Sequence, residues 1–297
     1  MSRPPADSRL TRFAVSAARR RRDRTARALI LAATLLALAP LMLIVYYLLR
    51  KGLGSWSTSF FSTDPTGNTF FASSSIGGIK SALLGTIEIV AVASAISVPI
   101  GIAVAVWLVE YGKGSRLATT VRFFVDVLTG VPSIIFGLFI YVALIVGTGS
   151  SYAGYKGSLA LSLLMLPVVT RSAEVILLLV PGELRESALA LGAPRWRVIA
   201  RIVLPTALPG MVTGVLLAIA RAAGETAPLL FTAAATLKTN LNLGQFMNSL
   251  PVQIYNDVTS PTTAVVNRAW GAALTLVLMI GVLNMIARIV ARRSRLA

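Results

Sequence analysis

The chain contains no cysteine and no histidine, and only 11 of its 297 residues are Asp or Glu. Disulfide bonds, thiolate chemistry and the usual zinc sites are therefore excluded, as are nucleophiles activated by an imidazole. The sequence also lacks a G-x-x-x-x-G-K-[S/T] phosphate loop and any alternation of strands and helices that could hold one. We accordingly expect no catalytic residue, no metal site and no cofactor in this chain, and no ATP site of its own.

Charged residues are scarce as well, at 13%, whereas apolar residues make up 56% of the chain. This composition is typical of integral membrane proteins. The net charge of +17 would also suit nucleic acid, but the cations lie at the ends of apolar runs, where they set orientation in a membrane. We therefore expect membrane lipid around this protein and no nucleic acid partner.

Six apolar runs predict an all-α, polytopic membrane protein, because about 20 apolar residues suffice to cross a bilayer. Five of the runs cover approximately residues 28–49, 82–109, 125–146, 207–231 and 270–287, and the remaining one, the fourth, begins near residue 157. In this fourth run, Arg171 and Glu174 follow after about 14 residues. Either the span ends there and the helix continues along the inner surface, which we favour, or both charges face the interior of the bundle.

The distribution of cations predicts that both termini are cytoplasmic. In that orientation the inner segments carry twenty Lys and Arg and the outer segments six, in agreement with the positive-inside rule. Residues 1–27, with nine Arg and two Asp, are expected to form a disordered basic tail in the cytoplasm. The segments that follow are the first membrane helix with its outer loop (28–76), the main membrane domain (77–290) and a cytoplasmic C-terminus (291–297).

The cytoplasmic loop at 182–206 has the pattern of a docking element. Residues 186–205 read ESALALGAPRWRVIARIVLP, and apolar residues at helical spacing predict two short amphipathic helices that meet at residues 192–194. A bend, an apolar ridge and flanking cations suit a helix that enters the groove of a partner. Trp196, between Arg195 and Arg197, would anchor in a partner pocket or, alternatively, rest on the membrane surface.

This loop resembles the coupling loop of permease subunits of ATP-binding-cassette importers. The shared pattern is Glu-x-Ala, three residues, Gly, nine residues and Ile-x-Leu-Pro, with Ser187 where Ala is commoner. The resemblance implies the type I importer permease fold, a location in the cytoplasmic (inner) membrane, a second homologous permease in a heterodimer, and a cytoplasmic ATPase dimer that binds ATP and Mg. The positions implied to contact the ATPase are Glu186, Ala188, Gly192, Arg195, Trp196, Ile202, Leu204 and Pro205.

A second group of polar residues lies inside the fifth apolar run. Arg221 is about 14 residues past the cytoplasmic start, or roughly 20 Å at ~1.5 Å per residue, so we expect it near the bilayer midplane. A guanidinium at that depth should face the bundle interior or an aqueous path, and Glu225, four residues on, would share its helix face. The pair either forms part of an anion pathway or is a static buried pair that fixes helix packing; the residues alone leave both open.

The segment 220–230, ARAAGETAPLL, resembles the corresponding segment of phosphate importer permeases, and matching blocks extend over roughly residues 77–288. The resemblance implies that Arg221, Glu225, Thr226 and Arg171 serve phosphate translocation, and that an extracytoplasmic phosphate-binding protein delivers the cargo. Sulfate and molybdate permeases share the loop and a similar Gly-Glu pair but continue differently after the Glu. Transport of another oxyanion, a membrane scaffold without transport and a secondary carrier remain the alternatives.

Overall fold

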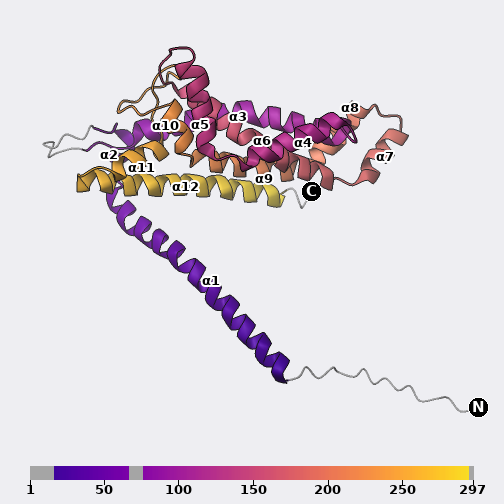
Figure 1. Ribbon diagram of the computed structural model, residues 1–297, viewed down its shortest axis with the longest axis horizontal. Coiled ribbons are helices and arrows are strands. Elements are labelled where there is room, and N and C mark those ends of the chain that lie inside the picture. Colours follow the sequence, from indigo (N-terminus) through magenta and orange to yellow (C-terminus); the bar gives the residue numbers. More distant parts are fainter. Residues whose placement is uncertain (1–16, 67–75, 294–297) are drawn as a thin grey trace, which may run out of the picture. The chain divides into compact units, whose positions relative to one another are not determined.

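The computed structural model describes residues 17–66 and 76–293, and the chain divides into two compact units, Met1–Leu49 and Arg50–Ala297. The described part of the first unit is a single helix, α1 (Ala17–Gly52), which ends within the second unit (Figure 1). Its apolar stretch is long enough to cross a membrane.

The predicted basic tail is shorter than 1–27, because α1 already begins at Ala17. Residues 17–27 contain no Gly or Pro and are mostly Arg and Ala, which are good helix formers. Asp23 and Arg27 also form an i,i+4 ion pair, with Oδ2 and Nη2 2.9 Å apart. The prediction of disorder is therefore wrong for residues 17–27, and its remainder, residues 1–16, lies outside the described residues.

The second unit is a helical bundle built on four long helices, shown together in Figure 1. They are α3 (Lys80–Val106), α6 (Gly154–Leu179), α9 (Leu204–Ala223) and α12 (Thr263–Arg293), and they pack in the order α3, α6, α9, α12. At one end of the bundle lie α2 (Thr58–Ser62), α10 (Ala227–Thr232) and α11 (Leu250–Val258), and at the other lie α7 (Gly182–Ala190) and α8 (Arg195–Val198).

Small residues allow these helices to approach closely. Every fourth residue of α3 from Gly85 to Ala105 is buried, as is every fourth residue of α6 from Leu161 to Leu177. A Cβ on Gly101 would lie 2.8 Å from Val169 Cγ1, so no side chain fits there. Helix α9 approaches α6 equally closely at Gly210 and Gly214, since a Cβ on either would lie 2.7 Å from a side-chain atom of α6.

The third predicted span, 125–146, is not one straight helix. Residues 116–146 form α4 (Arg116–Gly130) and α5 (Ser133–Ile140), which continues as a π-helical turn (Tyr141–Val146), and the two halves meet at 101°. Pro132 lacks an N–H and its ring disfavours a helical backbone at Val131, which is extended. The chain therefore breaks between α4 and α5 and re-enters the bundle through α5, which packs on α6 and α10.

The fifth predicted span, 207–231, is also divided. A continuous helical run from Arg195 through a π-helical turn (Ile199–Val203) leads into α9, which ends at Ala223. Residues 224–226 separate it from α10, whose second residue is Pro228. The second of the two short helices expected in the loop is thus the first turn of a membrane-spanning helix.

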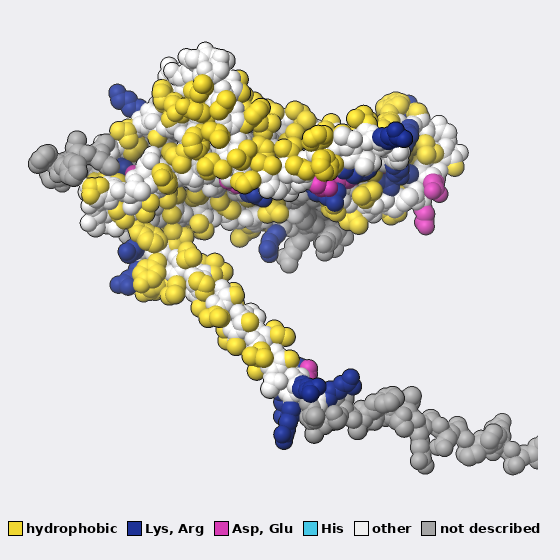
Figure 2. Space-filling model, in the orientation of Figure 1, with side chains coloured by type: hydrophobic (Ala, Val, Ile, Leu, Met, Phe, Trp, Pro, Cys, Tyr) yellow, Lys and Arg dark blue, Asp and Glu magenta, His cyan; other side chains and the backbone are white. Residues whose placement is uncertain are grey.

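The all-α class is confirmed for the described residues, which contain five helices long and apolar enough to span a membrane, or six if the bent pair α4–α5 forms one span. The fourth span is unbroken as far as Leu179. Its two charges do not share one environment, because Glu174 is buried and Arg171 is half exposed. Figure 2 shows apolar side chains over the middle of the bundle and charged ones gathered at the end that carries α7 and α8.

Candidate functional site

The break between α9 and α10 positions the first candidate site. Arg221 is in the last turn of α9, and the amides of Gly224 and Glu225 close that turn by donating to the carbonyls of Arg221 and Ala222. Arg221 Nε lies 3.5 Å from Glu225 Oε1, so the predicted ion pair is present. It does not follow from a shared helix face as expected, because the helix has already ended at Ala223.

The guanidinium of Arg221 is available to a ligand. Its side chain is 56% exposed, whereas that of Glu225 is 16% exposed. Among residues 17–66 and 76–293, Glu225 is its one ion-pair partner, and neither Nη group donates a hydrogen bond. An exposed arginine fork in a membrane-spanning segment suits a planar contact with an oxyanion. In this chain by itself, the pair is therefore only partly buried.

Thr226 lies beside this pair at the start of α10. Its carbonyl accepts from the amides of Leu229 and Leu230, but its hydroxyl does not cap the helix. The side chain is half-buried. Thr226 is therefore close to Glu225 in the break and retains a hydroxyl that can bind a ligand.

Arg171 belongs to a separate cluster, deeper toward the end that carries α7. Its Nη1 lies 3.0 Å from Glu174 Oε2 and its Nε lies 3.9 Å from Asp126 Oδ1. Glu174 is 3% exposed and also accepts from Arg122 Nε at 2.6 Å. The cluster of Asp126, Arg171, Glu174 and Arg122 thus alternates in sign, and Arg171 faces two carboxylates.

The packing of α6 on α9 places the two arginines at different depths. A Cβ on Gly214 would touch Ser172 Cβ, so these two residues lie at the same level, and Ser172 follows Arg171 directly. Arg221 is seven residues beyond Gly214, or about 10 Å along the helix axis. Arg171 and Arg221 are therefore successive cations along the bundle and do not form one binding site.

A glycine turn shapes the coupling loop, as the sequence predicted. At the end of α7 the amides of Gly192 and Ala193 donate to the carbonyls of Leu189 and Ala188, which is the Schellman arrangement. Gly192 has φ +78°, a left-handed conformation that favours glycine. The turn reverses the chain and directs it into α8.

The residues assigned to the partner contact divide into an outward and an inward set. Glu186, Gly192, Trp196 and Pro205 are exposed, while Ala188 is buried and Ile202 and Leu204 are half-buried in the apolar cluster beneath the loop. Arg195 is exposed but reaches back to the bundle, because its Nη2 donates to the carbonyl of Glu110 and its guanidinium stacks 5.1 Å from the centre of the Tyr111 ring. In the outward set, the side chain of Trp196 is 60% exposed and has the guanidinium of Arg197 against its ring.

Three buried or half-buried charges were not singled out from the sequence, namely Glu110, Arg122 and Arg185. Arg185 pairs with Glu110 and Arg122 pairs with Glu174, and both ion pairs link helices far apart in the chain. Their positions in or next to apolar runs were the available signal, since a charge there is expected to have a partner. Glu88 in α3 is another, and its Oε2 is buried without a hydrogen-bond partner among the described residues.

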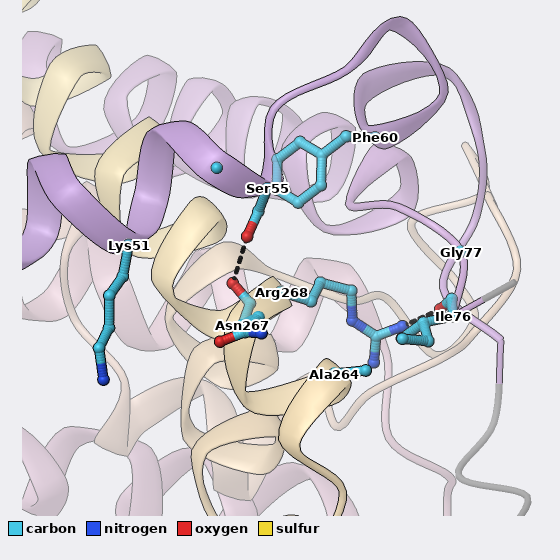
Figure 3. Close-up of a pocket in the computed structure, with 9 residues that line it drawn as sticks. Lys51, Ser55, Phe60, Ile76, Gly77, Ala264, Asn267 and Arg268 are labelled. Atoms are coloured by element: carbon cyan, nitrogen blue, oxygen red, sulfur yellow. Dashed lines mark hydrogen bonds between the residues drawn. The ribbon is translucent and has the colours of Figure 1, made fainter.

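A pocket of about 460 Å³ opens at the end opposite the coupling loop, between the start of α12 and the segments on either side of α2 (Figure 3). Arg268 points toward the carbonyl of Ile76 and also makes two hydrogen bonds to Asp257, each 2.8 Å long. Ser55 donates to the carbonyl of Asn267. Because the polar groups labelled there mostly satisfy one another, the pocket is a weaker ligand site than the break at Arg221.

Comparisons with known proteins agree with this architecture. The family described as binding-protein-dependent transport system inner membrane component matches residues 97–295. The phosphate transport system permease protein PstA 1 of Mycobacterium tuberculosis (strain CDC 1551 / Oshkosh) is 44% identical over 269 residues, which cover 87% of this chain and 86% of that protein. The protein PstA of Yersinia pestis is 39% identical over 278 residues, covering 93% and 92% respectively.

Solved structures show the same fold at lower identity. A methionine ABC transporter, MetNI, in an inward-facing conformation has a TM-score of 0.58 at 21% identity, covering 72% of this chain and 94% of that chain. A bacterial ABC transporter involved in the import of alginate has a TM-score of 0.60 at 17% identity, covering 92% and 96%. On the family match and the identity to its relatives, the chain belongs to the binding-protein-dependent transport system inner membrane components, and within them to the PstA permeases.

Proposed function

We propose that this chain is the permease subunit of an ATP-driven importer that moves inorganic phosphate across the cytoplasmic membrane. The chain works with a second homologous permease, a cytoplasmic ATPase dimer that binds ATP and Mg, and an extracytoplasmic phosphate-binding protein. Both termini lie on the cytoplasmic side. The names of the relatives support phosphate as the cargo, and the exposed guanidinium of Arg221 supplies the chemistry that an oxyanion needs.

One structural observation carries the proposal. Trp196 in the coupling loop and Arg221 at the break belong to the same unbroken helical run, Arg195–Ala223. A helix of this length is about 40 Å long, so a displacement at the loop is transmitted to the anion site along one rigid element. The chain supplies the lever and the cargo contact, and the hydrolysis of ATP takes place on another subunit.

The cargo contact follows from the geometry of the break. In the resting state Arg221 pairs with Glu225 at 3.5 Å, which is longer than a good charge-assisted hydrogen bond. An incoming phosphate binds the Nη groups of Arg221, and its remaining P–O–H group, present near neutral pH, donates a hydrogen bond to the carboxylate of Glu225. Arg171 receives the anion about 10 Å farther along. Ion pairs with Asp126 and Glu174 hold the side chain of Arg171 in place.

The proposal is tested by uptake of radiolabelled phosphate into proteoliposomes that contain the complete importer. We expect Arg221→Ala to lower uptake roughly 10- to 150-fold, because a hydrogen bond to a charged group contributes ~1.5–3 kcal/mol. Arg27→Ala is the matched control, since Arg27 also forms an i,i+4 ion pair with a carboxylate but lies in α1. Normal uptake in Arg221→Ala, with normal assembly, would exclude Arg221 from the pathway.

Selectivity is tested in the same vesicles with sulfate and molybdate as competitors. We expect Glu225→Gln to reduce the preference for phosphate over sulfate, because a neutral amide no longer discriminates in favour of an anion that donates a proton. ATP-dependent sulfate or molybdate uptake that exceeds phosphate uptake in the wild-type importer would instead assign it to another oxyanion. No ATP-dependent uptake of any of the three anions would favour a membrane scaffold.

A further inference from the structure

The coupling helix α7 is attached to the rest of the bundle by very few side chains. Of its nine residues, Gly182–Ala190, only Arg185 and Ala188 are not exposed. They are three positions apart and therefore lie on one face of the helix. Ala188 contributes a methyl group to the apolar cluster below, so Arg185 is the one long side chain of α7 that reaches the bundle.

Arg185 contacts two other helices at once. Its Nη1 donates to the carbonyl of Val180 at 2.6 Å and its Nη2 to the carbonyl of Leu177 at 2.8 Å. Both carbonyls belong to the C-terminal end of α6, where the last carbonyl groups have no helical N–H partner. The helix dipole also favours a cation at this end. Its Nε donates to Glu110 Oε1 at 3.0 Å, in the π-helical turn (Trp107–Tyr111) that ends α3.

The contact is shielded from water. The side chain of Arg185 is 15% exposed and that of Glu110 is 6% exposed. The carbonyl of Glu110 also accepts from Arg195 in α8, so both arms of the coupling loop are joined to the end of α3. An ion pair that is buried and also hydrogen-bonded on both sides resists separation, because breaking it leaves an uncompensated charge at a cost of ~3–5 kcal/mol.

The same network continues into the bundle. Arg122 in α4 donates through Nη2 to the carbonyl of Leu108, two residues before Glu110. It also donates through Nε to Glu174, which lies five residues before the end of α6. The middle of α4 is thus linked to the last turns of α3 and α6, which Arg185 links in turn to α7. Apolar contact alone would let α7 slide, whereas directional ionic contacts fix its position.

We infer that Arg185 and Glu110 form a clasp through which movement of α7 is transmitted to α3 and α6 as well as along α9. This inference rests on the proposed function and adds a positioning role for two residues. Neither residue contacts the cargo. The clasp stays closed while the bundle switches between its two states, so that α3 and α6 move with the coupling helix.

The clasp is tested in the complete importer, reconstituted with its ATPase and binding protein, by the ratio of phosphate taken up to ATP hydrolysed. We expect Arg185→Met and Glu110→Gln to lower this ratio on the order of tenfold, within the ~5- to 150-fold range that coupling free energies between sites typically span. Hydrolysis itself continues, because the outward residues of the loop still bind the ATPase. A purely structural role would lower the amount of assembled complex and leave the ratio unchanged.

The chain offers a matched control at its opposite end. Asp257 and Arg268 form a buried ion pair of similar geometry, with Nη2 and Oδ1 2.8 Å apart, but far from α7. We expect Arg268→Met to reduce stability and keep the uptake ratio of the wild type. If this variant does not assemble, Asp257→Asn with Arg268→Met removes both charges and serves in its place.

A covalent replacement separates the clasp from loss of fold. Because the chain has no native cysteine, Glu110→Cys with Arg185→Cys can be joined by a short bifunctional thiol reagent, with linkage confirmed by mass spectrometry. We expect a low uptake ratio before linkage and recovery of most of the ratio after it. A normal ratio in Arg185→Met, or no recovery after confirmed linkage, would overturn the clasp, whereas failure of the wild-type importer to take up phosphate would overturn the proposed function itself.

Discussion

Replacement of Glu174 by Gln tests whether the buried ionic cluster stabilises the fold. Glu174 is 3% exposed and accepts from Arg122 at 2.6 Å and from Arg171 at 3.0 Å. A hydrogen bond to a charged group contributes ~1.5–3 kcal/mol, but the half-exposed Arg171 should be counted at the surface value of ~0–1 kcal/mol. The loss is therefore about 2–4 kcal/mol, and Gln preserves the volume of the side chain, so that no cavity adds to it.

The assay is the apparent melting temperature of the purified complex in detergent, followed as the soluble fraction on size exclusion after heating. At about 2–4 °C per kcal/mol for domains of comparable size, Glu174→Gln should melt roughly 5–15 °C below wild type. Asp23→Asn is the control, because it removes only the exposed i,i+4 pair with Arg27, which is expected to contribute ~0.2–0.5 kcal/mol. If Glu174→Gln melts within the range of this control, the cluster does not stabilise the bundle and the reasoning about its burial is wrong.

Two further predictions concern packing and the partner contact. Gly214→Ala introduces a Cβ at 2.7 Å from Ser172 Cβ, so we expect the overpacking to lower stability by ~1–3 kcal/mol in the same melting assay. Gly130→Ala is the control, because a Cβ there meets open space, and it should lower stability by no more than Asp23→Asn does. Equal melting temperatures for the two glycine variants would contradict the close approach of α6 and α9. Trp196→Ala removes the large exposed aromatic side chain of the coupling loop. We expect it to weaken binding of the ATPase roughly tenfold, or by ~1.4 kcal/mol, when the ATPase is titrated onto the permease pair in lipid nanodiscs. Unchanged affinity would favour the alternative that Trp196 rests on the membrane surface.

Local patterns in the sequence were sufficient for much of the fold. Long apolar runs identified an all-α membrane protein, and the Glu-x-Ala and Gly spacing of residues 186–192 identified the bend of the coupling loop, which the structure forms around Gly192. The ion pair of Arg221 and Glu225 was also predictable, because four residues separate them on either a helix or the turn that ends one. Each of these features depends on residues close together in the chain.

Tertiary packing decided which charges are buried and what they join. Glu174 meets Arg122 across 52 positions and Arg185 meets Glu110 across 75, and no helical or strand period relates residues that far apart. The angle of 101° between α4 and α5 arises at Pro132, which the sequence shows. A proline is also compatible with a kinked but continuous span, so the sequence left both arrangements open. The packing of α5 on α6 and α10 selects the bend. The sequence by itself therefore determined that the chain spans a membrane and carries a coupling loop and a cation in its fifth apolar run, while the close packing of the helices determined that Arg221 is exposed, Glu174 is enclosed and Arg185 ties α7 to two other helices.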